Sequence, residues 1–270
     1  MEEKHIYNLD KLIKTSYRLL EITRKMLQSC QLKRNKVYSD RRFIISFFFR
    51  RAWQLYESFL MLIKENRLID SLILLRSFCE MGINLGYIFS DKIDNDEKNI
   101  RALKYMLNGD EAQLKIINAN LEDFKEIDSK IEDRRDKLKQ DIKKIKKILK
   151  KKYGLENWDL PSLDQRATES GFDIIKKIYN QIYRYTSNIE HHNIFFGRDY
   201  VNKNRCEPRE SLEKFSQLPH LKPPVILYLF RIIYIEVLGA FNDEFKLNWE
   251  KKLSEIKKIH EDEYPLLRNN

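Results

Sequence analysis

The stretch FIISFFFRRAWQLYESFLMLI (residues 43–63) decides the fold, because its apolar side chains fall on most sides of a helix rather than along one stripe. A helix that is apolar on most sides has to be covered by other helices. Ser39 and Asp40 precede the stretch and can cap its first turn. We therefore expect a central helix here, inside an all-α helical bundle.

A second apolar stretch, LIDSLILLRSFCEMGINLGYIF (68–89), carries charged residues in its middle turns. Arg76 and Glu80 are four residues apart, so they are neighbours on one face of a helix and can pair. A charged pair in an apolar helix is costly unless another group satisfies it. Two interpretations stay open, a mutually neutralised structural pair or the lining of a polar pocket.

The low content of turn residues favours long helices with few connections. The 270 residues include only 7 Gly and 6 Pro, whereas a sheet protein of this length needs many more. Pro223 and Pro224 open a further helix around VILYLF (225–230). That apolar run is too short to span a bilayer, and Arg231 follows it, so we expect a buried helix and no membrane partner.

A charged segment interrupts the apolar pattern of the bundle. From Leu114 apolar residues follow a three-four spacing as far as Leu149, with Asp128 and Arg135 at two positions where the pattern expects apolar residues. We expect a long helix, or a helical hairpin bent near one of those interruptions, that ends at Gly154. The predicted organisation is one bundle domain formed by 1–110 and 155–270, with 111–154 inserted as a projecting, basic, coiled-coil-like arm.

The end of this arm is densely basic. A run of lysines there is either a solvated face or a contact for RNA, a membrane or an acidic partner. The whole chain has 51 basic and 41 acidic residues, a formal charge of +10, which makes RNA or another polyanion a plausible partner. The candidate nucleic-acid-binding residues are Lys143, Lys144, Lys146, Lys147, Lys150 and Lys151.

The cysteines and the N-terminus predict a cytoplasmic protein. Cys30, Cys79 and Cys206 are far apart and odd in number, which argues against a disulfide framework or a zinc ribbon. The N-terminal MEEKHIYNLDK has no apolar core with a cleavage site, so no secretion signal is expected.

The segment RYTSNIEHH (184–192) carries a polar stripe in a predicted helix. Arg184 and His191 are seven residues apart, so a helix returns them to within roughly 20° of one another, two turns apart. Ser187 and Asn188 lie between them on that face.

The residue types of this stripe suit the cleavage of RNA without a metal. Histidine can move the 2′-hydroxyl or leaving-group proton near neutral pH. The Arg184 guanidinium can stabilise the charge that builds on the phosphate, and Ser187 or Asn188 can add a hydrogen bond. The alternative is a helix end where Arg184 meets a carboxylate and His191 and His192 interact with the last carbonyls.

A metal site is not expected in this segment. His191 and His192 are adjacent, so on a helix their side chains point about 100° apart and do not readily share one ion. Helical metal sites place His and carboxylates three or four residues apart, and no Glu-x-x-His occurs here. We expect no metal and no cofactor.

The combination of motif and helical composition resembles the HEPN superfamily of helical nucleases and nucleotide-binding proteins. The resemblance rests on Arg184-x6-His191 near the end of a helix and covers bundle helices at about 40–90 and 160–245. The pairing of LLRSFCE (74–80) with IYRYTSNIEHH (182–192) is also similar to a large, poorly characterised group of bacterial all-α proteins close to that superfamily. The resemblance to the HEPN superfamily implies a metal-independent endoribonuclease site formed by Arg184 and His191, completed by a second subunit in a homodimer. Such a protein would act as a toxin or phage-defence effector, with an antitoxin or defence-system partner.

The resemblance leaves a second function open. Tyr185 follows the arginine, where that superfamily typically has a polar residue. Other members use the same bundle to bind nucleotides or partners without cleaving. The alternative expectation is therefore a non-catalytic helical module that binds nucleic acid or protein.

Overall fold

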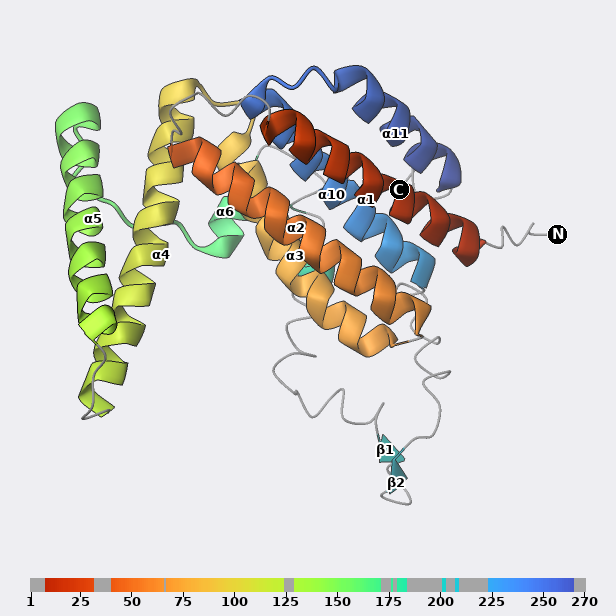
Figure 1. Cartoon of the computed structure of the whole chain (residues 1–270), viewed down its shortest axis with the longest axis horizontal. Helices are drawn as coiled ribbons and strands as arrows, with labels where there is room; N and C mark the ends of the chain where they lie inside the picture. The colour runs from red at the N-terminus through yellow and green to blue at the C-terminus, as the bar shows by residue number, and fades with distance from the viewer. Residues whose placement is uncertain are drawn as a thin grey trace.

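Three apolar helices form the interior of the bundle, α2 (Asp40–Lys64), α3 (Leu68–Phe89) and α10 (Pro223–Phe245) (Figure 1). Their contact is rich in aromatic rings. Phe230 of α10 stacks on Phe59 of α2 with ring centroids 3.8 Å apart, and it lies 4.5 Å from Phe78 of α3. The helix expected at 43–63 therefore contributes one face to the bundle core, but the expectation that other helices cover it on most sides is wrong, because Phe43, Phe47 and Met61 stay exposed.

Two further helices, α1 (Leu9–Gln31) and α11 (Glu250–Glu263), lie against α10. Each is amphipathic and turns its apolar residues toward the bundle. In Figure 1 they form the upper right part of the molecule, with the N-terminus of α1 and the end of α11 at the same side.

Arg231 of α10 joins these outer helices from inside the core. Its side chain is 0% exposed, and Nη2 donates to the Leu12 carbonyl at 2.6 Å and to the Ser16 hydroxyl at 3.0 Å. Nη1 forms an ion pair with Glu263. Removing one member of a buried ion pair costs about 3–5 kcal/mol, so this contact firmly fixes the C-terminal helix to the N-terminal one.

The charged segment forms a helical hairpin of α4 (Asn95–Asp123) and α5 (Ser129–Tyr153), which stands off from the bundle in Figure 1. Of the two predicted arrangements, the structure has the hairpin. α4 also packs against α2 and α3, so one continuous helix belongs to both the bundle and the arm. α4 begins at Asn95, so the boundary expected at 111 falls inside this helix.

The hairpin has a small core of its own. The buried apolar residues of α5 face α4 and leave the lysines on the opposite side of the helix. This hairpin core consists of Leu103, Leu107, Ile142, Ile145 and Leu149.

Gly154 ends α5, as the sequence predicts. Its φ is +68°, a left-handed conformation that glycine adopts without strain. The Gly154 N–H donates to the Lys150 carbonyl at 3.1 Å, which satisfies one of the last carbonyls of the helix. The next residue, Leu155, packs on the hairpin core.

The chain then returns to α3 through the short helix α6 (Leu163–Glu169) and a single π-helical turn, η1 (Tyr179–Tyr183). Ser162 caps α6 in a capping box with Gln165. Two-residue strands, β1 (Val201–Asn202) and β2 (Glu207–Pro208), pair antiparallel. The all-α class is confirmed.

The structure, a computed structural model, describes residues 8–31, 40–65, 67–123, 129–170, 176, 179–183, 201–202, 207–208 and 223–264. Within these ranges, residues 70–89 of α3 and all of α10 are long and apolar enough to cross a membrane by length and composition. Most of each apolar stretch is buried inside the bundle, as in the core helix of a bundle.

Candidate functional site

A polar junction lies where α6 and η1 cover α3. Arg76, Glu80, Asn84 and Tyr87 follow one another at intervals of four, four and three residues, so α3 presents them on one face. Both α6 and η1 pack on α3. The "polar junction" denotes Arg76, Glu80, Asn84, Tyr105, Arg166 and Tyr183.

Arg76 contacts η1 at this junction. Its Nη2 donates to the Tyr183 hydroxyl at 3.3 Å, and its guanidinium lies 5.1 Å from the centroid of the same ring. Tyr183 in turn stacks on Tyr179, with centroids 5.4 Å apart. Among the described residues no ion pair joins Arg76 to Glu80, so the structure does not have the mutually neutralised pair; Arg76 is directed at the tyrosine of η1 instead.

Arg166 enters the junction from α6. Its Nη1 donates to Oδ1 of the buried Asn84, whereas its Nε is buried without a hydrogen-bond partner among the described residues. Burial lowers the pKa of Arg166, and the nearby Glu80 carboxylate and Tyr105 hydroxyl oppose that shift. Glu80 itself is exposed. The junction therefore holds a half-buried cation, Arg166, beside the exposed carboxylate of Glu80.

These groups give the junction the chemistry of an anion site. Arg76 and Arg166 are half-buried, and a guanidinium offers five N–H donors in a planar fork that matches phosphate oxygens. Tyr183 and Tyr105 add hydroxyl groups beside them. The second interpretation of Arg76 and Glu80, the lining of a polar pocket, stays a prediction.

The predicted catalytic stripe follows the junction directly in the chain. Arg184 is the next residue after Tyr183, which α3 contacts through Arg76. Arg184, Ser187, Asn188, His191 and His192 themselves lie outside the described residues.

The predicted lysines lie on α5, away from the junction. Lys143, Lys144, Lys147 and Lys151 are exposed on the side opposite the hairpin core, and they take part in no ion pair among the described residues. Lys146 and Lys150 pair with Glu111 at 2.7 Å and Glu156 at 3.7 Å. The "lysine face" denotes Lys143, Lys144, Lys147 and Lys151.

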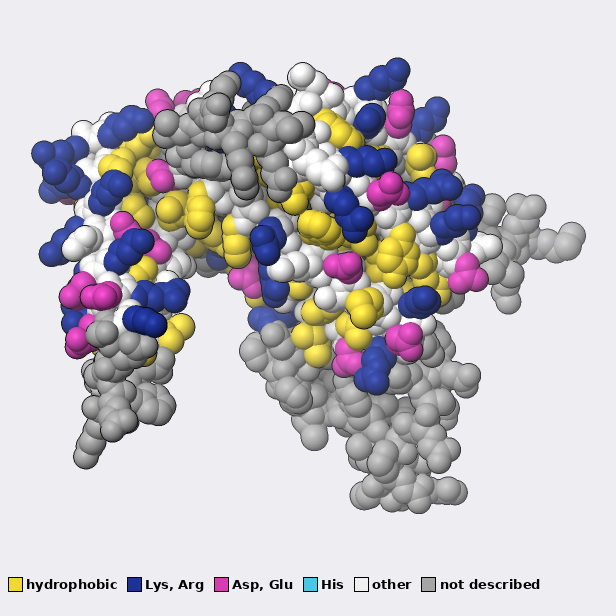
Figure 2. Space-filling model, viewed as in Figure 1, with side chains coloured by type: hydrophobic (Ala, Val, Ile, Leu, Met, Phe, Trp, Pro, Cys, Tyr) yellow, Lys and Arg dark blue, Asp and Glu magenta, His cyan; other side chains and the backbone are white. Residues whose placement is uncertain are grey.

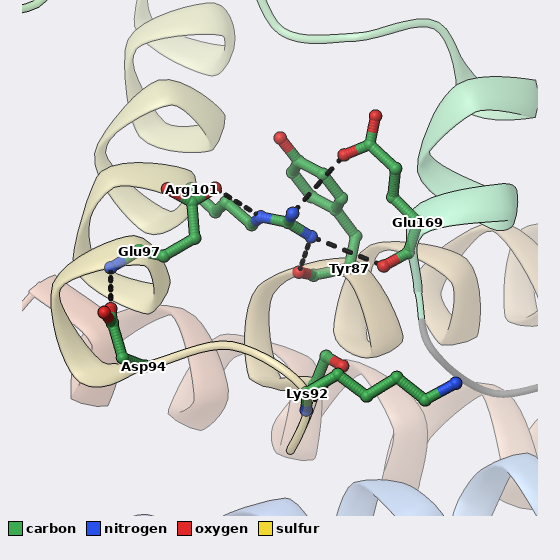
Figure 3. Close-up of polar contacts among 7 residues, drawn as sticks. Tyr87, Lys92, Asp94, Glu97, Arg101 and Glu169 are labelled. Atoms are coloured by element: carbon green, nitrogen blue, oxygen red, sulfur yellow. Dashed lines mark hydrogen bonds and ion pairs between the residues drawn. The ribbon is translucent and has the colours of Figure 1, made fainter.

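Arg101 fixes α4 against both α3 and α6, close to the junction (Figure 3). Its Nε donates to Glu97 at 2.7 Å, its Nη1 to the Tyr87 carbonyl at 2.9 Å, and its Nη2 pairs with Glu169 at 3.4 Å. The guanidinium lies 4.2 Å from the Tyr87 ring centroid. Burial raises the pKa of Tyr87 to about 12, and the charge of Arg101 opposes the shift.

No group of three or more His, Cys, Asp or Glu residues that could hold a metal ion occurs within the part of the chain that the structure describes. Sequence reasoning identified Arg76 and Glu80 but missed Asn84, Arg166 and Tyr183. Their signal in the sequence is weak, because α6 is short and η1 is irregular, and only packing brings them onto α3.

A family model matches residues 42–208, more than half of the chain, and its description is a family of unknown function, DUF5677. The protein belongs to the DUF5677 family. The matched region contains most of α2 and the elements from α3 to η1, and thus both the polar junction and the lysine face. Neither the curated proteins nor the solved structures provide a match.

Proposed function

We propose that this DUF5677 protein is a metal-independent endoribonuclease, a toxin or phage-defence effector in which Arg184 and His191 act on RNA. One observation carries the proposal. Tyr183, the residue before Arg184, packs against Arg76 at a junction that also contains the desolvated Arg166. In the sequence, the predicted catalytic stripe follows directly after this tyrosine, whose partner Arg76 offers a guanidinium group suited to phosphate.

The proposed roles follow from the chemistry of each group. His191 takes the proton of the attacking 2′-hydroxyl or supplies one to the leaving 5′-oxygen. Arg184 stabilises the charge that builds on the nonbridging oxygens of the scissile phosphate. Arg76 and Arg166 hold a neighbouring phosphate and so position the RNA. Ser187 and Asn188 donate hydrogen bonds to the scissile phosphate, and His192 supports His191.

The first test is cleavage of total RNA by the purified protein with EDTA present. We expect His191→Ala to lower the cleavage rate by about 10²–10⁴-fold, because it removes the general acid or base. Arg184→Ala should have a comparable effect, whereas Arg76→Ala should mainly raise KM. His5→Ala, outside the motif, is the matched control and should cleave like the wild type.

Growth of an expressing bacterial host gives the second readout. The wild type should arrest growth, and His191→Ala and Arg184→Ala should relieve the arrest. Equal cleavage by wild type and His191→Ala, or a wild type that neither cleaves RNA nor arrests growth, contradicts the proposal.

A second candidate function is a nucleic-acid-binding module without catalysis. The observation that favours it is the lysine face, where four exposed lysines, without ion-pair partners among the described residues, lie on one side of α5. Surface lysines of this kind bind phosphates through charge and counterion release. A protein that binds RNA with high salt dependence and leaves it intact would match this function.

A further inference from the structure

The outward face of α2 is unusually apolar for an exposed surface. Phe43, Phe47 and Met61 are 61%, 52% and 60% exposed, although the opposite side of the same helix forms the bundle core. Taking Gln54 as the middle of this face, all three lie within about 20° of it on a helical projection. Figure 2 shows apolar side chains at intervals along α2, with charged side chains between them.

Two charged residues flank this apolar row on one side. Arg50 lies about 40° and Glu57 about 60° from the line through Gln54, both in the same direction. Both are exposed, and neither takes part in an ion pair among the described residues. They are seven residues apart, about 10.5 Å along the axis, so they do not pair with each other.

We propose that this face is the contact of a symmetric homodimer in which α2 packs antiparallel on α2 of a second copy. A two-fold axis between positions 53 and 54 places Arg50 level with Glu57 of the partner subunit, and the reverse pair forms by symmetry. The same axis brings Phe47 close to Met61 of the partner subunit. Arg51, on the other flank, then lies near Ser58 of the partner subunit rather than near a like charge.

The charges on the α2 face indicate that a second copy of this chain binds there, because the face is complementary to its own copy. Its acidic and basic flanking groups match only when the helix is reversed, whereas a parallel two-fold pairing would bring Arg50 beside Arg51 of the partner subunit. A single helix pair buries less than the about 1,200–2,000 Å² of a standard interface. The dimer should therefore be reversible, with a dissociation constant in the micromolar range.

Sedimentation equilibrium of the full chain tests the proposal. The wild type should show a monomer–dimer equilibrium at micromolar concentrations, and Phe47→Glu should be monomeric. Arg50→Glu and Glu57→Arg should each weaken the dimer at least about tenfold, because each places like charges opposite one another. The double variant Arg50→Glu/Glu57→Arg should restore dimerisation to near the wild-type level.

Glu255→Arg, an exposed acid on α11, is the matched charge control and should leave the equilibrium unchanged. Circular dichroism of every variant checks that the exposed substitutions keep the fold. A second readout is Gln54→Cys, which should form a disulfide-linked dimer on oxidation, whereas Gln140→Cys on α5 should not. A wild type that stays monomeric, or a double variant as weak as the single ones, overturns the proposal.

Discussion

His260 of α11 lies 3% exposed against the ring of Tyr228, with centroids 4.7 Å apart. Neither of its ring nitrogens has a hydrogen-bond partner among the described residues. Burial lowers the pKa of His260 to about 3, and the positive charges of Arg231 and Lys257 add to the shift. The imidazole is therefore neutral in the folded protein under conditions in which an exposed histidine carries charge.

The lowered pKa of His260 predicts a loss of stability in acid that comes from this residue. His260 of the unfolded chain binds a proton below about pH 6.5, whereas His260 of the folded chain does so only near pH 3. The free energy of unfolding is therefore fully present above pH 6.5, and part of it is lost as the pH falls from 6.5 toward 3. At pH 4.5 the loss is about 2–3 kcal/mol. His260→Phe keeps the stacking on Tyr228 and should lose that much less stability between pH 7 and 4.5 in urea unfolding. Equal losses in both proteins would show that His260 is not the source.

Among the single residues of the polar junction, the sequence predicts Arg76 and Glu80 but not Arg166. Arg76 and Glu80 stand out because a charge in an apolar helix demands an explanation. Arg166 lies in a largely polar stretch, and nothing near it in the sequence marks it as buried. Its environment comes from Asn84 and Tyr105, which are distant from it in the chain.

The lysine face of α5 is a property of a whole helix. Lys143 and Lys147 are one turn apart, so they project together on the side opposite Ile145 and Leu149. We expect Lys143→Glu/Lys147→Glu to weaken the binding of single-stranded RNA and to reduce the slope of log K against log [salt] by about 0.7 for each phosphate that the variant no longer neutralises. Fluorescence anisotropy across a KCl series measures both quantities.

The matched control for this prediction is Lys251→Glu/Lys258→Glu on α11, which changes the net charge equally at two exposed positions. If both double variants lose affinity to the same extent, overall charge rather than the lysine face determines binding.

Periodicity indicates α1 and α5, because apolar residues recur in them with helical spacing, whereas α10 is apolar on most sides. Two helix ends also have a physical signal: Gly154 adopts a left-handed conformation at the end of α5, and the Ser162 side chain caps the start of α6. The start of α4 at Asn95 is harder to predict, since its sequence turns polar there while still packing on the bundle. A boundary between body and arm cannot be seen in the pattern of one continuous helix.

At the scale of the whole molecule, the described residues form two main apolar cores of different size. The bundle core contains residues from α1, α2, α3, α10 and α11, whereas the hairpin core is confined to α4 and α5. A small core that shares only one helix with the bundle can open without unfolding the rest. The sequence predicts a projecting arm, but the separate packing of that arm follows only from the structure.

Leu149→Ala tests this separation. Leu149 is fully buried in the hairpin core, so its truncation should cost the hairpin about 2–5 kcal/mol. Hydrogen exchange should accelerate in α5 and in the half of α4 that faces it, while α2 and α10 keep their protection. Leu227→Ala in the bundle core is the control and should accelerate exchange in the bundle helices. Equal acceleration in α10 and α5 after Leu149→Ala would contradict two independently opening units.

The short helix α6 carries both Arg166, which lies in the polar junction, and Glu169, which binds Arg101 of α4. A rigid helix of seven residues cannot shift at one of these side chains without displacing the other. A shift of α6 as a whole toward an anion at Arg166 would thus also move Glu169 and its ion pair with Arg101, at the base of the α4–α5 hairpin. The polar junction and the root of the hairpin are thus joined through the two turns of α6.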